Sequence, residues 1–496
     1  MDRDLAIRWA LVIAIMLVSI GGIVYGTYLL LFIVGTLPEK ILAFLFLTLV
    51  TVNTVFNAFG SYYYIHSYGL DKFIPKKLKH YPRVAIVMPS RNEDEEMVKR
   101  NIESITRMDY PKERLKIYLL DNSTSSSREL EKFCDEIGVK YVYMENPVKL
   151  KSYVMNKFLD IVDEEYVAIF DADEYLIDLS FLRQTLPFLD KKAGFVQTIK
   201  EFAPGSFFAN AVNVYYLFFY KFMQPVRNLC RSPMFCGSCG IVRKSVVKSV
   251  GGFPKSPTED LAFAFKADIA GRGGIFISKK YALGAPIESF ETFLSQQWRY
   301  TIGNMWTLKD YLKNLSKLTT EKHIHYISQT FGYAYLSILF IFYSLLAVVF
   351  VLTDISLRSL NSQVLIPEHM KLVAASYLIS VVILVVLGGR LYFGSFKSGL
   401  LAFFLNFATA IVRAKAMLVG LFNFKTEFIM SRQNRSKNSI MDALRVSITE
   451  TAFSAILLSF SLISFIRRDV ISAFWLFWYS WLFFCSFLFT YGTDVG

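Results

Sequence analysis

The stretch YVAIFDAD at residues 166–173 decides the fold of the central part of this chain. Its five leading residues are apolar or aromatic, and two carboxylates two residues apart follow them directly. A short apolar run closed by a polar turn is typical of a buried strand. Three further runs read as strands in the same way, at residues 84–88, 117–120 and 140–144.

Amphipathic segments separate these runs, and one of them opens at the acidic turn 92–96 and extends to about Thr106. This alternation between Asp71 and about His325 predicts an α/β domain with a mainly parallel sheet and helices on both faces. Ligands in such sheets bind at the carboxyl ends of the strands. Pro89, Asp121 and Asp171 follow three separate strands, so we expect them to meet at one edge.

The composition indicates a membrane protein around this domain. Hydrophobic residues make up 54% of the chain and aromatic residues 16%, and about 20 apolar residues cross a bilayer. The first apolar run is too long for a signal peptide and a second follows at once, so we expect it to be retained. The candidate spans are residues 9–33, 41–65, 328–352, 371–389, 449–466 and 471–490.

Residues 397–422 form an ambiguous apolar segment, interrupted by Arg413 and Lys415. If this segment crossed the membrane, the basic loop after it would lie outside, against the positive-inside rule. We therefore expect an interfacial or re-entrant helix on the cytoplasmic side, with six spans and both termini in the cytosol. Arg467 and Arg468 then fall in an outer loop, which counts against this topology. The chain is therefore expected to divide into two N-terminal membrane helices (1–70), the α/β domain (71–291), an amphipathic helix region (292–325) and a C-terminal membrane region (326–496).

The net charge of +13 is expected to reflect a basic cytoplasmic rim facing anionic lipid and a site for a diphosphate. Nucleic acid is the rival partner for a basic chain. The basic residues are scattered and no nucleic-acid-binding motif is present, so we expect none.

The five cysteines do not form the pattern of a disulfide scaffold. Cys236 and Cys239 have the spacing of a metal or redox pair, but a structural zinc site needs four ligands and Cys230 is the only near third. Small loop residues beside a substrate are the favoured interpretation.

Asp171 and Asp173 are candidate ligands for a divalent cation. Mg²⁺ and Mn²⁺ take oxygen ligands and are often held by one or two carboxylates together with substrate phosphates. Acidic turns after strands are common, so the pair alone is weak evidence. Its place at the predicted binding edge strengthens the interpretation.

Asp260 follows Thr258 and Glu259 and opens an apolar helix through about Ala270. A carboxylate at a helix start is often only a favourable partner of the helix dipole. It could also be a general base that takes a proton from an attacking hydroxyl. The neighbouring motifs favour the base.

The segment QQWRYTIG at residues 296–303 is predicted to lie on a helix with an apolar stripe. The stripe suits a helix on a membrane or domain surface, and a simple anchor is the alternative. Arg299 argues for more than an anchor, because its planar fork suits a diphosphate. Lys151 is a second candidate phosphate contact, with a solvated loop charge as the equal alternative.

Nine short motifs in order make residues 84–303 resemble the membrane-bound inverting glycosyltransferases of family 2, in the cellulose synthase and hyaluronan synthase branch. They are Pro89-Ser90-Arg91-Asn92-Glu93, Asp121-Asn122-Ser123, Lys151-Ser152-Tyr153-Val154-Met155-Asn156, Asp171-Ala172-Asp173, Val196-Gln197-Thr198, Phe235-Cys236-Gly237, Gly251-Gly252-Phe253, Thr258-Glu259-Asp260 and Gln296-Gln297-Trp298-Arg299-Tyr300.

The resemblance implies a GT-A-type domain, inserted between membrane helices, that displaces a nucleotide diphosphate in one inverting step with Asp260 as the base. It implies that Asp171 and Asp173 serve a metal, Mg²⁺ or Mn²⁺. Donor contacts, usually to a UDP-sugar, would come from Pro89, Asn92, Glu93, Asp121, Lys151, Asp171, Gln296 and Arg299. Acceptor contacts would come from Phe235, Cys236, Gly237, Trp298 and Tyr300, with Gln296 and Arg299 between donor and acceptor.

Two departures leave the acceptor open. The family's helix motif usually ends in Trp, whereas Tyr300 stands there and a Trp lies at position 298. Cellulose synthases also have a gating loop after the catalytic domain. Residues 425–435 stand at about that place in this chain, but they do not align with the loop. We expect a polysaccharide synthase of the plasma membrane that exports its product. The alternatives are transfer of one sugar to a lipid, as in ceramide glucosyltransferases, and a non-catalytic scaffold or transporter.

Overall fold

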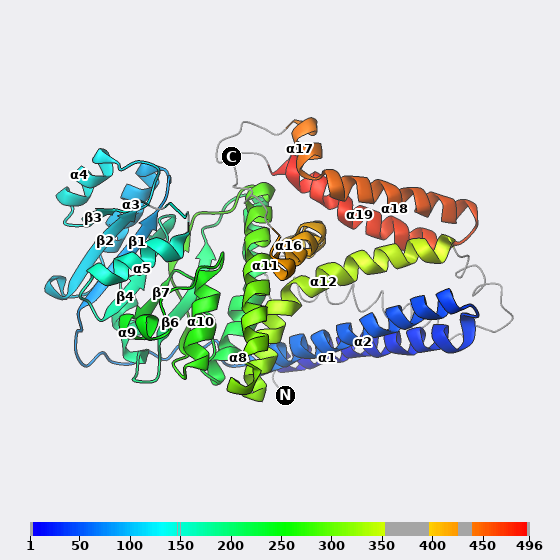
Figure 1. The fold of residues 1–496 in the computed structure, drawn as a ribbon, viewed down its shortest axis with the longest axis horizontal. Coiled ribbons are helices and arrows are strands. Elements are labelled where there is room, and N and C mark those ends of the chain that lie inside the picture. The colour runs from blue at the N-terminus through cyan, green and yellow to red at the C-terminus, as the bar shows by residue number, and fades with distance from the viewer. Residues whose placement is uncertain (1–2, 146, 149, 353–395, 425–438, 494–496) are drawn as a thin grey trace.

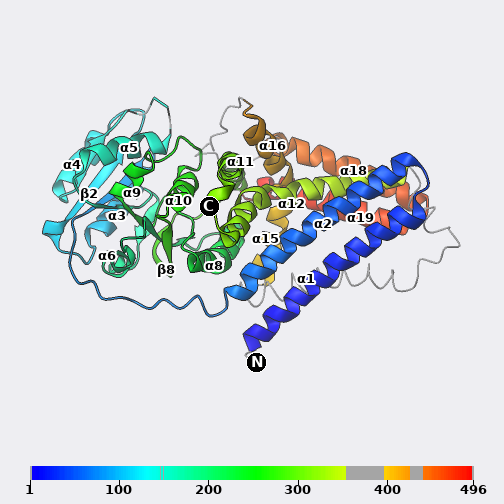
Figure 2. The same cartoon turned by 60° about the horizontal axis from the view of Figure 1, so that its bottom comes forward.

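The computed structural model describes residues 3–145, 147–148, 150–352, 396–424 and 439–493. A sheet domain lies on one side and a group of long helices on the other (Figure 1). The chain passes from the first helix pair into the sheet domain and returns to the long helices afterwards (Figure 2).

The sheet has eight strands in the order β3-β2-β1-β4-β7-β6-β8-β5. Strands β3, β2, β1 and β4 lie side by side and all run parallel, which confirms the predicted α/β class. The sequence did not indicate that β7 runs antiparallel to both β4 and β6 and that β5 runs antiparallel to β8. The strands are β1 (Val84–Ser90), β2 (Leu115–Asp121), β3 (Lys140–Tyr143), β4 (Tyr166–Ile169), β5 (Glu174–Leu176), β6 (Phe195–Phe202), β7 (Gly240–Arg243) and β8 (Gly274–Gly284).

Helices cover both faces of this sheet, as the sequence predicted. One face packs against α3 (Glu95–Thr106), α4 (Arg128–Glu136) and α6 (Phe181–Thr185). The other packs against α5 (Lys151–Ile161), α9 (Lys244–Ser249) and α10 (Glu259–Ile269). Helix α3 shows how the sequence sets these elements: the Asp94 side chain accepts from the Met97 N–H and caps its start, and Val98, Ile102 and Ile105 fall on its buried face. Both faces of the sheet are therefore apolar, and its strand ends remain for polar groups.

Five described helices are long and apolar enough to cross a membrane: α1 (Arg3–Tyr28), α2 (Leu37–His66), α12 (Thr320–Leu352), α18 (Ile448–Ile466) and α19 (Val470–Gly492). Helices α15 (Phe396–Ala408) and α16 (Ala410–Phe422) form a pair bent by 46°, as a broken span or a re-entrant segment would be. The expected span at 371–389 and the segment 425–435 lie outside or largely outside the described residues.

Shorter helical elements complete the described chain. They are α7 (Phe207–Phe218), the π-helical η4 (Phe219–Met223), α8 (Gln224–Leu229) and α17 (Ile440–Val446), with further turns at η1 (Leu29–Ile33), η2 (Lys112–Arg114), η3 (Leu186–Phe188) and η5 (Leu315–Lys317).

Helix α11 (Phe290–Lys313) stands between the sheet domain and the long helices (Figure 1). A Cβ on Gly303 would lie 2.0 Å from the Thr258 side chain, and one on Gly420 of α16 would lie 2.7 Å from Met305. Such close approaches require glycine. Helix α11 contacts α10 of the sheet domain on one side and α12 and α16 on the other. Its apolar residues Leu294, Ile302 and Met305 are buried, whereas Leu312 near its end is 56% exposed. Its position at a membrane surface stays a prediction.

Candidate active site

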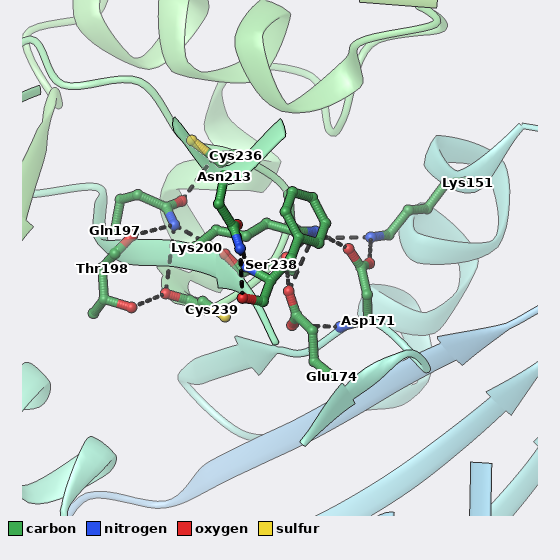
Figure 3. A network of polar contacts seen from close by, with 12 residues as sticks. Lys151, Asp171, Glu174, Gln197, Thr198, Lys200, Asn213, Cys236, Ser238 and Cys239 are labelled. Carbon is green, nitrogen blue, oxygen red and sulfur yellow. Dashed lines mark hydrogen bonds and ion pairs between the residues drawn. The ribbon is translucent and has the colours of Figure 1, made fainter. Parts of the chain in front are cut away.

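Asp171, two residues after the end of β4, is held by two lysines from different elements (Figure 3). Lys151, the first residue of α5, donates to Asp171 Oδ1 at 2.5 Å, and Lys200 on β6 donates to Asp171 Oδ2 at 2.6 Å. Lys151 also donates to the Gly237 carbonyl at 3.0 Å. Both carboxylate oxygens are thus fixed by ammonium groups, and the strand ends converge as the sequence predicted.

Glu174 on β5 supports this arrangement from below (Figure 3). Its Oε2 accepts from the Asp171 N–H at 2.9 Å, and its Oε1 accepts from the Ser238 hydroxyl at 2.6 Å and lies 3.2 Å from Lys200 Nζ. Glu174 is fully buried. A buried carboxylate requires such partners. It therefore fixes both the turn after β4 and the direction of the Lys200 side chain.

The pKa values of the two aspartates move in opposite directions. Burial alone would raise the pKa of the Asp171 carboxyl, but the charges of Lys151 and Lys200 outweigh it and hold that pKa well below its usual range. Burial raises the pKa of Asp173 to about 7, with further contributions from Asp171, Glu174 and Glu93 and opposition from Lys200. Asp171 is a permanent anion, whereas Asp173 is a carboxylate that a cation would stabilise.

The described residues contain no cluster of three or more His, Cys, Asp or Glu side chains that could hold a metal by itself. The two aspartates nevertheless fit a cation that is completed by substrate phosphates. In the described part of the chain, no hydrogen bond or ion pair engages the Asp173 side chain. The five cysteines are all free, so Cys236 and Cys239 form no disulfide.

Asp260 lies at the first turn of α10, where its Oδ1 accepts from the Leu261 N–H at 2.8 Å. Among the described residues no cation lies within ion-pair distance of it. Burial raises the pKa of Asp260, while its helix N–H and more distant cations oppose that rise. Burial and the Asp260 charge raise the pKa of neighbouring Glu259 to about 7. A half-buried carboxylate with a raised pKa and no fixed counterion can accept a proton.

The loop before β7 brings the predicted acceptor residues against Asp260. Gly237 has φ of +76°, and a Cβ there would lie 3.1 Å from Asp260 Oδ2. The Gln197 side chain accepts from the Cys236 N–H at 2.7 Å and donates to the Ser238 carbonyl at 2.9 Å, which fixes the loop from β6. The left-handed backbone conformation favours glycine here, and a Cβ at this position would also press against the Asp260 carboxylate.

The residues predicted to hold the nucleotide lie at the ends of β1 and β2. Asn92, with φ of +55°, accepts from the Thr124 N–H at 3.0 Å and so joins the two loops. Asp121 is 1% exposed, and its oxygens accept from the Ser123 N–H at 2.9 Å and the Tyr141 hydroxyl at 2.5 Å. Pro89 pairs with Leu120 inside the sheet. Asp121 therefore shapes this edge, and its contact with a nucleotide stays a prediction.

A cavity of about 620 Å³ extends from the catalytic domain to the long helices. Lys200, Asp260, Phe235, Cys236 and Tyr300 line it on the domain side. Its other walls come from α1, α2, η4, α12 and the bent pair α15–α16. The volume is typical of a site for a small organic ligand. The predicted base Asp260 and Lys200, the partner of Asp171, thus line one chamber.

The predicted site residues on helix α11 face in different directions, and only some of them line the cavity. Tyr300 lies on the cavity wall, whereas Trp298 does not. Gln296 accepts from the Tyr216 hydroxyl at 3.2 Å. The guanidinium of Arg299 lies 5.4 Å from the Tyr300 ring centre, and its charge acts on Glu259 and Asp260. Of the two aromatic residues of this helix motif, Tyr300 therefore lines the cavity and Trp298 does not.

The sequence did not single out Lys200, Glu174 or Ser238, and Glu259 appeared only as a neighbour of Asp260. A signal for Lys200 existed, because a lysine four residues after Val196 sits at the carboxyl end of a strand that opens with four buried residues. Glu174 is one residue beyond Asp173 and could have been recognised as part of the same acidic turn.

Comparisons with known proteins fit this geometry. Residues 85–251 match the family model described as glycosyl transferase family 2. They form a family 2 glycosyltransferase domain. The matched residues include both lysines and the Asp171–Asp173 pair, whereas Asp260 and Arg299 lie beyond them.

Curated relatives of this glycosyltransferase domain are cellulose synthases. The chain is 30% identical to the UDP-forming cellulose synthase catalytic subunit of Pseudomonas fluorescens over 234 residues, which are 45% of this chain and 31% of that protein. It is 28% identical to putative cellulose synthase 2 of Komagataeibacter xylinus over 239 residues, 46% of this chain and 16% of that protein. The chain therefore spans only a minor part of these relatives.

Among solved structures, the chain is similar to a mannosyltransferase from Pyrobaculum calidifontis in complex with GDP-Man and Mn²⁺. The TM-score is 0.49 and the identity 15%, with 72% of this chain and 97% of that chain covered. A second structure, of S. aureus TarS residues 1–349 with UDP-GlcNAc, has a TM-score of 0.32, 16% identity and coverage of 60% and 89%.

Proposed function

We propose that this chain is a membrane-embedded inverting glycosyltransferase that transfers a sugar from a UDP-sugar to a growing polysaccharide. The observation that carries the proposal is the shared cavity wall of Asp260 and Lys200. Lys200 binds Asp171, the residue predicted to lie beside the diphosphate, and this supports a base and a diphosphate facing one chamber. Similarity to cellulose synthases supports the polysaccharide and the UDP donor.

The transfer step is a single displacement. Asp260 takes the proton of the acceptor hydroxyl while that oxygen forms a bond to the anomeric carbon. The bond from this carbon to the diphosphate oxygen breaks, and the nucleoside diphosphate leaves with the electron pair. Lys151, Lys200 and Arg299 would provide positive charge on the side where the leaving group's negative charge develops. A base on one side and cations on the other are what inversion requires.

A divalent cation, Mg²⁺ or Mn²⁺, would be held by Asp173, with Asp171 beside it and diphosphate oxygens completing its ligands. When bound, it would neutralise charge on the leaving diphosphate. Asp171 already carries two ammonium partners, so Asp173 is the carboxylate that gains most from a cation. The protein's own cations act in the same direction.

We further propose a plasma-membrane location, with the catalytic domain in the cytosol and the product exported through the long helices. Transfer of one sugar to a lipid is the second candidate, because α1 and α2 contribute apolar side chains to the cavity. The purified full chain, incubated with labelled UDP-sugars and Mg²⁺ or Mn²⁺, separates the two by product size. If the only product is a glycolipid with a single sugar, the polysaccharide proposal is contradicted. If no sugar is transferred at all, the result favours a non-catalytic scaffold.

A further inference from the structure

Arg413 is a buried cation on the wall of the cavity that also contains Asp260. It lies in α16, within the bent helix pair, and only 3% of it is exposed. Charged side chains in a membrane-facing region are rare, and they mark binding or transport sites when they face a cavity. Arg413 has no part in the proposed transfer step.

Among the described residues, Arg413 contacts only neutral groups. Its Nη1 donates to the Tyr215 hydroxyl at 3.3 Å, and its Nη2 donates to the Asn406 side chain at 3.2 Å. The Tyr333 ring centre lies 5.9 Å from the guanidinium carbon. Its Nε is buried with no hydrogen-bond partner among the described residues. Within that part of the chain, no carboxylate lies within ion-pair distance of Arg413.

Arg8 shows the contrasting case in this protein. It is also buried, at 6% exposure, and it forms an ion pair with Asp4 at 3.1 Å. A buried charge is unfavourable unless it is paired and hydrogen-bonded. Arg413 borders an open chamber, so an anion could enter that chamber and supply the missing charge. The guanidinium fork suits phosphate or carboxylate oxygens.

The rest of the cavity wall limits what can carry this anion. Near the catalytic domain the wall is polar, with Lys200, Asp260 and Asn304. On the side of the first two long helices it is mainly apolar, with Asn57, Ser61 and two tyrosines of α2 as its polar part. The apolar residues there are Leu11, Ile15, Phe56 and Phe59. A saccharide chain needs hydrogen-bond partners along its length, whereas a hydrocarbon tail matches this apolar side.

We propose that the cavity binds an acceptor attached to a lipid phosphate, with Arg413 binding the phosphate and α1 and α2 contacting the hydrocarbon tail. This rests on the proposed transferase function and names its acceptor class. It is independent of how many sugars are added. Tyr215 connects the two functions, because its hydroxyl contacts Arg413 and donates to Gln297 of α11 at 3.0 Å. The phosphate site is thus tied to the helix that carries Arg299.

The test measures equilibrium binding of labelled farnesyl phosphate and of farnesol to the purified full chain in neutral detergent. The wild type is expected to bind the phosphate roughly tenfold or more tightly than the alcohol, as one charge-assisted contact provides. Arg413→Gln should remove this preference, and Arg413→Lys should retain part of it. Lys415→Gln is the matched control: Lys415 lies on the same helix, is exposed and donates to Thr449, so its loss should leave the preference unchanged.

The proposal is overturned if the wild type shows no preference or if Arg413→Gln, with an unchanged melting temperature, keeps it. It is also overturned if an oligoglucuronate binds in an Arg413-dependent way and farnesyl phosphate does not, because the site then accepts an acidic polymer. UDP binding to the same preparations reports on the donor site separately. Loss of UDP binding alone would count against the transferase proposal and leave the lipid site standing.

Discussion

Two carboxylates of the site, Asp171 and Asp260, are surrounded in opposite ways. Asp171 contacts two ammonium groups and stays ionised, whereas Asp260 accepts one hydrogen bond from its own helix and has a raised pKa. A carboxylate fixed between cations cannot take up a proton at neutral pH, and one without a fixed counterion can. We therefore expect Asp171 to act in binding and Asp260 in proton transfer.

Asp260→Asn should have the largest effect. The amide keeps the shape but cannot accept the proton, so the transfer rate should fall by about 10² to 10⁴-fold. UDP affinity, measured by calorimetry on the purified protein, should stay within about twofold of the wild type. An unchanged transfer rate would remove Asp260 from the role of base.

Asp171→Asn should act on binding instead. The substitution leaves Lys151 and Lys200 without their shared anion, so UDP affinity should change by about tenfold or more and the melting temperature should fall. Asp178→Asn is the matched control, because Asp178 pairs with Lys279 at 2.6 Å outside the cavity wall. It should lower the melting temperature without changing UDP affinity. If both variants changed UDP affinity equally, the binding role of Asp171 would be contradicted.

Gly237→Ala should disturb the surroundings of Asp260 without touching Asp171. The new Cβ would lie 3.1 Å from Asp260 Oδ2, and a loss of about tenfold in transfer rate is expected because the base is displaced. Gly251→Ala controls for backbone strain, since its φ of +87° is equally unfavourable and nothing lies within 4 Å. Both should lower stability by about 1 to 2 kcal/mol. Only the first should slow transfer, as steady-state rates will show.

Trp298→Leu should have the smallest effect. Trp298 does not line the cavity, so the acceptor KM should change by less than about threefold. Tyr300→Leu, which removes a ring from the cavity wall, should raise that KM by about tenfold. A larger effect at 298 than at 300 would mean that the acceptor follows a different path.

The strand ends and the site motifs could be predicted because they are local. A continuous apolar run followed by Asp121 or Asp171 indicates both a buried strand and its polar end. The antiparallel part of the sheet could not be predicted from the sequence. Strands β5 and β7 are too short to show a periodicity, and their pairing is set by distant chain segments.

The burial of a second, more polar face of α11 could not be predicted, for a different reason. Its second buried face carries Thr301 and Asn304, whose side chains donate to the carbonyls of Gln297 and Tyr300 at 2.8 Å. Small polar residues that bond to their own helix can be buried against protein, yet in the sequence they read as a solvated face. Lys200 was missed similarly, because a lysine on a strand is usually at the surface and its partial burial depends on the distant partners Glu174 and Asp171.

The pH dependence of the single-turnover transfer rate, with donor saturating, tests the central claim most directly. Asp260 must be deprotonated to act as the base, and burial raises its pKa, so the rate should be high above that pKa and be lost as the pH falls through it. The account predicts an acid limb of about tenfold per pH unit, displaced above the usual aspartate range, while UDP affinity measured without a divalent cation changes little. A rate that stays flat down to the ordinary pKa of a carboxyl would contradict it.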